Sequence, residues 1–182
     1  MLVAALALLA AAPAPVTPPR PPTEVSGVTI YPLTPPPKVV ASYPPAGGAV
    51  APGVVVLKLT FDQKMLQTGF DLAPVDGGAE PPPCLKTPRL LDDGKTFVLL
   101  CTLRAGKSYA LALNAGPRAE APNFGFANVY ERRAIPTSLA FTTTRDEPIR
   151  SLDAAMKLQG LTPLEVPVQE DPVTARPVAV QP

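Results

Sequence analysis

Proline is the residue that most limits what this chain can fold into. The 27 prolines are distributed unevenly, with dense runs between Pro13 and Pro45 and again from Pro148 to the C-terminus. Proline lacks the backbone N–H group that helices and sheet ladders use, so such runs favour linkers and tails. We therefore expect the folded part to lie between Val39 and Thr143, a length that suits one small domain.

Apolar residues alternate with polar ones in this middle part of the chain. In the clearest stretch, Leu57, Leu59 and Phe61 alternate with Lys58 and Thr60, which indicates a strand with one buried face. Similar stretches lie between turn signals at 39–43, 54–61, 70–75, 85–91, 96–103, 109–113 and 139–142. About seven short strands at this spacing predict an all-β fold, an antiparallel β-sandwich.

The stretch LRAGKSYALAL (103–113) places a tyrosine where a turn becomes a strand. In Greek-key sandwiches a tyrosine at such a position packs under the crossover between the sheets, and its hydroxyl binds a backbone group slightly upstream. The apolar Leu103, the bend at Gly106 and the ring of Tyr109 therefore predict a structural tyrosine corner rather than a catalytic phenol.

Four stretches, taken in order, resemble a bacterial Ig-like domain of the type found in S-layer and other envelope proteins. They are VVASYPPAGGAV (39–50), LKLTFDQKM (57–65), the hairpin DDGKTFVLL with LRAGKSYALAL (92–113), and LAFTT (139–143). The resemblance implies an Ig-like Greek-key sandwich over residues 38–145 and a structural or adhesive role. Lys64 departs from the family pattern, which commonly has proline there.

The two cysteines, Cys84 and Cys101, lie on opposite arms of the hairpin whose turn contains Asp92, Asp93 and Gly94. Their nearly symmetrical placement allows a disulfide, which an even cysteine count in an exported chain also favours. Buried free thiols and a metal pair are the alternatives. A zinc site would need carboxylates or a second chain as additional ligands, because the chain has no His.

The segment 114–138 is longer than a simple connection between strands. It contains the aromatic residues Phe124, Phe126 and Tyr130, followed by Arg132 and Arg133. Two interpretations are open. The aromatic residues can fold back over an open end of the sandwich, or the segment can be a binding loop of the kind that such scaffolds carry.

The N-terminal stretch MLVAALALLAAA (1–12) is continuously apolar but too short to span a bilayer. We expect a signal peptide at 1–14, which implies export to the periplasm or the cell exterior and no transmembrane segment after cleavage. The alternative is a cytosolic Ala-rich leader, since no basic residue precedes the apolar run. A Pro-rich linker, expected to be disordered, follows at 15–37.

Residues 146–182 are expected to form a C-terminal tail that contains a short helix at 149–158. This helix is either frayed or docked on the sandwich or on a partner, because three turns are marginal alone. The final stretch DPVTARPVAVQP (171–182) is either disordered or an extended peptide that adds to the edge of a partner's sheet.

Several function classes are disfavoured by composition. The formal net charge is +1 and aromatic residues make up 5%, so the chain lacks the basic footprint of a nucleic-acid-binding protein. With no His, neither a Ser-His-Asp nor a Cys-His arrangement can form, and we expect no enzyme. Copper-binding relatives of the Ig-like family use His and Met clusters, whereas the three Met here are far apart, so we expect no cofactor.

Together these features predict a non-catalytic, exported Ig-like domain with a structural, adhesive or partner-docking role in the cell envelope. The expected partner is an envelope protein or a glycan. The alternative function is a carbohydrate- or peptidoglycan-binding accessory module that uses the 114–138 segment. A third possibility is a subunit of a larger envelope assembly.

Overall fold

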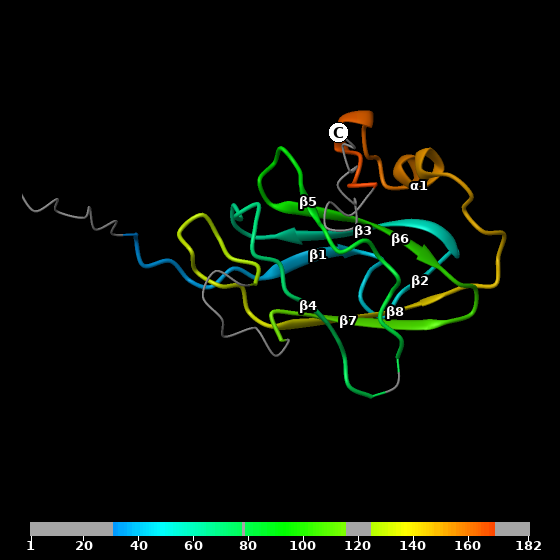
Figure 1. Ribbon diagram of the computed structural model, residues 1–182, viewed down its shortest axis with the longest axis horizontal. Coiled ribbons are helices and arrows are strands. Elements are labelled where there is room, and N and C mark those ends of the chain that lie inside the picture. The colour runs from blue at the N-terminus through cyan, green and yellow to red at the C-terminus, as the bar shows by residue number, and fades with distance from the viewer. Residues whose placement is uncertain (1–30, 78, 116–124, 170–182) are drawn as a thin grey trace, which may run out of the picture. The chain divides into compact units, whose positions relative to one another are not determined.

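The computed structural model describes residues 31–77, 79–115 and 125–169, and those of them from Pro32 onward belong to one compact unit. Its strands belong to two sheets, which lie face to face (Figure 1). The first sheet has the order β1 (Val39–Tyr43), β3 (Gly53–Phe61), β6 (Thr96–Leu103), β5 (Arg89–Leu90). The second has the order β2 (Ala49–Val50), β8 (Thr137–Thr143), β7 (Ser108–Leu113), β4 (Leu72–Pro74). The predicted all-β sandwich is therefore confirmed.

The strand orders are those of an immunoglobulin sandwich. The first sheet corresponds to strands A, B, E and D, and β4, β7 and β8 of the second correspond to C, F and G. Pairing is antiparallel except between β2 and β8, which run parallel. The short strand β2 is an eighth strand in addition to the expected seven. Its pairing joins Ala49 to Thr142, a contact between distant segments that leaves no local sequence pattern.

Alternation along the strands builds the core between the sheets. The inward residues are almost all large and apolar, and the ladder between β3 and β6 sets them opposite one another. The buried inward residues of β3, β6, β7 and β8 are Val55, Leu57, Leu59, Phe61, Phe97, Leu99, Cys101, Leu103, Tyr109, Leu111, Leu113, Leu139 and Phe141.

The outer face of the first sheet is covered by the C-terminal part of the chain. Helix α1 (Leu152–Leu158) packs on β3 and lies on the outer side of the sheet in Figure 1. Ala155 and Met156 contact the outward side chains Val56 and Val98, which are both fully buried. This cover explains why the first half of β3 is apolar on both faces and only its second half alternates.

Polar contacts also attach the C-terminal segment to the sheet. The guanidinium of Arg89 donates to the carbonyls of Val166 at 2.6 Å and Leu164 at 2.7 Å, and Leu164 belongs to the 3-10 turn η1 (Pro163–Glu165). Gln159 Nε2 donates to the carbonyl of Val56 at 2.7 Å. The segment expected as a tail is thus a docked third layer as far as the structure describes it.

The part of the expected linker that the structure describes also packs on the sandwich. Ile135 N–H donates to the carbonyl of Pro37 at 2.8 Å, and Gln63 Nε2 donates to that of Pro35 at 3.0 Å. The expected signal peptide (1–14), the linker up to residue 30 and the tail at 171–182 lie outside the described residues. Within those described, no helix has the length and apolar character needed to cross a bilayer.

Candidate functional site

The base of the 114–138 segment is closed by the side chain of Asn114. Its Oδ1 accepts from Phe126 N–H at 2.7 Å, and its Nδ2 donates to the carbonyls of Phe126 at 2.9 Å and Ala134 at 3.0 Å. Asn114 is buried and has a positive φ of 54°, a conformation that asparagine tolerates better than most residues. The side chain of Asn114 therefore holds both Phe126 and Ala134 against the end of β7.

Phe126 lies in the core of the sandwich. Its side chain is 1% exposed and its ring contacts those of Phe61, Phe70 and Phe97, at centroid distances between 5.0 and 5.8 Å. This aromatic cluster closes one end of the space between the sheets. Phe126 therefore folds back into the sandwich, which is the first of the two interpretations of this segment. Phe124 lies outside the described residues.

The next residues form a tight hairpin in which Ala127 pairs with Arg133, and Asn128, at the start of its turn, is 1% exposed. Asn128 Nδ2 donates to Gln63 Oε1 at 2.8 Å and to Thr34 Oγ1 at 3.0 Å. Its Oδ1 accepts from the backbone N–H groups of Tyr130 at 3.0 Å and Arg132 at 2.9 Å. A single buried amide thus joins the hairpin to the N-terminal segment and to the loop after β3.

Backbone hydrogen bonds add to this attachment. Val129 N–H donates to the carbonyl of Lys64 at 3.1 Å, and Leu66 N–H donates to that of Ala127 at 2.8 Å. Glu131 has a positive φ of 61°, a conformation that costs energy for this residue type and persists only where surrounding contacts impose it. The hairpin conformation is therefore set before any partner binds.

The hairpin and its neighbours present apolar side chains to solvent. Exposed fractions are 40% for Val129, 41% for Tyr130, 48% for Ile135 and 99% for Leu33. Hydrogen bonds between Asn128 and Thr34, and between Ile135 and Pro37, keep their segments together. We call these four residues the end patch. Arg132 is exposed and Arg133 is half-buried beside it, which adds cationic groups to the rim.

The end patch was only partly predictable. The sequence pointed to Tyr130, Arg132 and Arg133 in this segment, and the structure keeps them in one hairpin. The two buried asparagines, Asn114 and Asn128, were not predicted as supports. A signal existed for Asn114, because an asparagine directly after a buried strand is a common way to end it with a left-handed residue.

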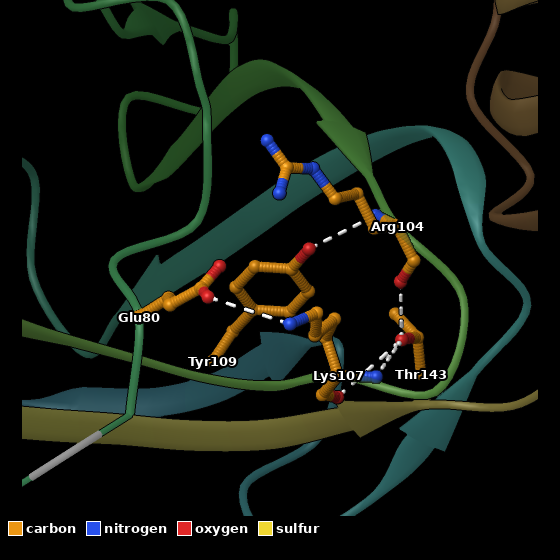
Figure 2. A network of polar contacts seen from close by, with 5 residues as sticks. All are labelled: Glu80, Arg104, Lys107, Tyr109 and Thr143. Carbon is orange, nitrogen blue, oxygen red and sulfur yellow. Dashed lines mark hydrogen bonds and ion pairs between the residues drawn. The ribbon is translucent and has the colours of Figure 1, made fainter.

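The predicted tyrosine corner lies at the other end of β7 (Figure 2). The hydroxyl of Tyr109 accepts from Arg104 N–H at 2.9 Å, and its ring is 1% exposed beneath the connection from β6 to β7. Thr143 Oγ1 donates to the carbonyl of Arg104 at 2.6 Å and accepts from Lys107 N–H at 2.9 Å. These contacts assign Tyr109 a structural role.

An ion pair crosses the outside of this corner. Lys107 Nζ lies 3.5 Å from Glu80 Oε1, and both side chains are about half exposed (Figure 2). An exposed pair of this kind adds little to stability. Leu103 is buried beside the corner, and Gly106 has the positive φ of 64° that its bend requires.

The disulfide between Cys84 and Cys101 is present, as predicted. The Cα atoms are 3.9 Å apart, and the cysteines form an isolated antiparallel bridge. The arms are not in simple register, because Leu90 pairs with Phe97 whereas Cys84 pairs with Cys101. The shift of two residues explains why the expected strand at 85–91 is reduced to Arg89–Leu90.

Two hollows open at the surface of the sandwich. A cavity of about 340 Å³ opens between β4 and the Cys84–Lys86 stretch, and Asp71 is the acidic residue among those that line it. A second hollow of about 390 Å³ lies between β1 and β8, and none of the described residues that line it is charged. In the described part of the chain, no group of three or more His, Cys, Asp or Glu residues could hold a metal ion.

Comparison with protein-family models finds no match for this chain, and no curated protein matches it either.

Proposed function

We propose that this protein is a non-catalytic, exported Ig-like domain that docks a protein partner in the cell envelope through the end patch. The proposal includes membership in the bacterial Ig-like family of envelope proteins, supported by the strand order and by the tyrosine corner. Export is supported by the N-terminal apolar stretch and by the disulfide, since disulfides persist in oxidising compartments.

The observation that carries this proposal is the support of the hairpin by Asn128. Four hydrogen bonds to one buried side chain fix a loop that exposes Val129 and Tyr130. Binding then orders few additional groups, which lowers the entropic cost of association. An exposed apolar centre with Tyr and Arg nearby also has the composition of protein–protein interfaces.

The test is in-situ cross-linking of the tagged protein, followed by mass spectrometry of the envelope fraction. Wild type is compared with Val129→Glu, which places a charge in the end patch, and with Leu158→Glu as a matched control. Leu158 is 65% exposed on α1, on the outer side of the first sheet. We expect a stoichiometric partner that is lost with Val129→Glu and retained with Leu158→Glu. Retention with both variants would contradict the proposal.

A glycan-binding module is the second candidate, favoured by the exposed ring of Tyr130 next to Arg132. Branched apolar residues dominate the end patch, however, and Phe126, a second aromatic of the segment, is buried. Enrichment of peptidoglycan fragments in the same pull-down, without a protein partner and dependent on Tyr130, would favour this candidate.

A further inference from the structure

In the part of the chain that the structure describes, the sandwich is open along one side, between β1 of the first sheet and β8 of the second. We call this opening the seam. Its hollow of about 390 Å³ has an apolar floor made by Leu59, Leu113 and Leu139, which belong to the core. The walls come from β1, from the turn that follows it and from the start of β8.

Among the described strands, none pairs with the outer edge of β1. Phe61 N–H binds the carbonyl of Lys95 on the β6 side, so Thr60 and Lys58 direct their backbone groups toward β1. Their partners there are Ala41 and Tyr43. Ser42, between them, must direct its N–H and C=O groups away from β3, toward the seam.

The seam lacks charged side chains, which are one of the features that protect a sheet edge. Natural edge strands are commonly protected by charged side chains, by proline or by bulges. Here β1 has an irregularity between Val39 and Ala41, but no charged residue stands in β1 or in β8. The residues that form the walls are Val39, Val40, Ala41, Ser42, Pro45, Ala46, Thr137 and Ser138.

The seam is continuous with the end patch. Ile135 belongs to the patch and lies two residues before β8, while Pro37 lies two residues before β1. The hydrogen bond between Ile135 N–H and the carbonyl of Pro37 joins the two segments at the entrance of the seam. A partner bound to the end patch therefore has the seam directly beside it.

We propose that the docked partner supplies an extended, uncharged peptide segment, with apolar residues at alternate positions, that adds to the free edge of β1. This inference rests on the proposed docking function. Strand addition provides backbone hydrogen bonds for affinity, and alternate side chains enter the hollow for specificity. An uncharged segment fits because a charged group in the seam would lose its hydration without gaining an opposite charge.

The test uses the full chain and a blocked peptide of alternating valine and threonine as the probe. Amide hydrogen exchange is measured at Ser42 with and without the peptide. We expect the peptide to slow exchange there about tenfold. A control peptide with aspartate in place of each valine should leave exchange unchanged. Unchanged exchange with the valine peptide would overturn the inference.

Two variants place a charge on the walls without disturbing the core. Ala46→Asp and Ser138→Asp lie at exposed positions that line the seam, and Ala154→Asp on α1 is the matched control. We expect both seam variants to weaken peptide binding about tenfold or more and the control to bind as wild type does. Equal binding by all three variants would overturn the inference.

The same variants separate this inference from the docking function in the cross-linking experiment. Loss of the partner with Val129→Glu, but not with Ala46→Asp, would leave the end patch as the docking surface and refute the seam. A second copy as the occupant would appear as a concentration-dependent dimer of the full chain that Ala46→Asp abolishes. That outcome would also overturn the proposal.

Discussion

Asn114 and Phe126 pair as two strand residues would, but through a side chain: the amide of Asn114 accepts from Phe126 N–H at 2.7 Å and donates to its carbonyl at 2.9 Å. This pairing fixes the point at which the 114–138 segment returns to the sandwich. It also sets the ring of Phe126 into the aromatic cluster. The end patch depends on it, because the hairpin begins one residue after Phe126.

Replacing Asn114 should therefore destabilise the protein. Asn114→Ala removes three hydrogen bonds and leaves buried backbone groups of Phe126 unpaired, so we expect a loss of about 3 kcal/mol in the free energy of unfolding. Urea denaturation measures it, with the exposed Gln67→Ala as control. A loss no larger than that of the control would show that the clamp does not stabilise the fold.

The tyrosine corner has a smaller expected contribution. Tyr109→Phe keeps the buried ring but leaves Arg104 N–H without the hydroxyl that it binds, at a cost of about 1 kcal/mol. Arg104→Ala keeps this backbone donor and should unfold as wild type does. Equal stability of Tyr109→Phe and wild type would mean that packing alone holds the corner.

Reduction of the disulfide should lower stability substantially. The bond closes a loop with a sequence separation of 17 residues, for which chain entropy predicts about 3 kcal/mol. Urea unfolding of the oxidised protein is compared with the reduced protein and with the double variant Cys84→Ala, Cys101→Ala. Both should unfold at lower urea than the oxidised protein, and coincident transitions would exclude a stabilising role.

Asp93 in the hairpin turn should make stability depend on pH. Burial raises the pKa of the Asp93 carboxyl. Hydrogen bonds from the Thr96 hydroxyl and from the N–H groups of Lys95 and Thr96 lower this pKa by a larger amount, so the net pKa is below the ordinary 3.8. Its contribution is complete above the unfolded pKa and is lost as pH falls through the folded value.

Wild type should consequently lose more stability than Asp93→Asn between about pH 6 and about pH 3. The asparagine keeps an acceptor oxygen but does not titrate, so it serves as the matched variant. Parallel stability curves for the two proteins in urea would show that another carboxyl governs the acid transition.

The docked C-terminal layer should also contribute to the free energy of unfolding. Met156 is 5% exposed against the outer face of the first sheet, so Met156→Ala should cost about 2 kcal/mol. Leu158→Ala, at a position 65% exposed on the same helix, should cost less than about 0.5 kcal/mol. Similar losses for both variants would mean that the helix does not pack as described.

The sequence by itself determined the sandwich. Alternation in β3, β6 and β7 reports which face is buried, because side chains of a strand point to opposite faces in turn. The hairpin at Asp92–Gly94 and the corner at Tyr109 are equally local, since turn chemistry and a hydroxyl reaching a few residues upstream depend on neighbours in the chain. The placement of the cysteines on the two arms of that hairpin favoured a disulfide over free thiols or a metal pair, but the two-residue shift that brings Cys84 opposite Cys101 appears only in the folded chain.

Tertiary structure decided the features that depend on contacts between distant segments. The short strand β2 exists only because β8 lies beside it, and the apolar outer face of β3 has meaning only once α1 covers Val56. The hairpin that contains Tyr130 is held in one conformation because the side chain of Asn128 donates to Gln63 and Thr34, and this support makes the hairpin a candidate binding loop. Hydrogen bonds across such separations leave no periodic pattern in a sequence, so only the folded chain shows which side chains support the end patch and which remain exposed.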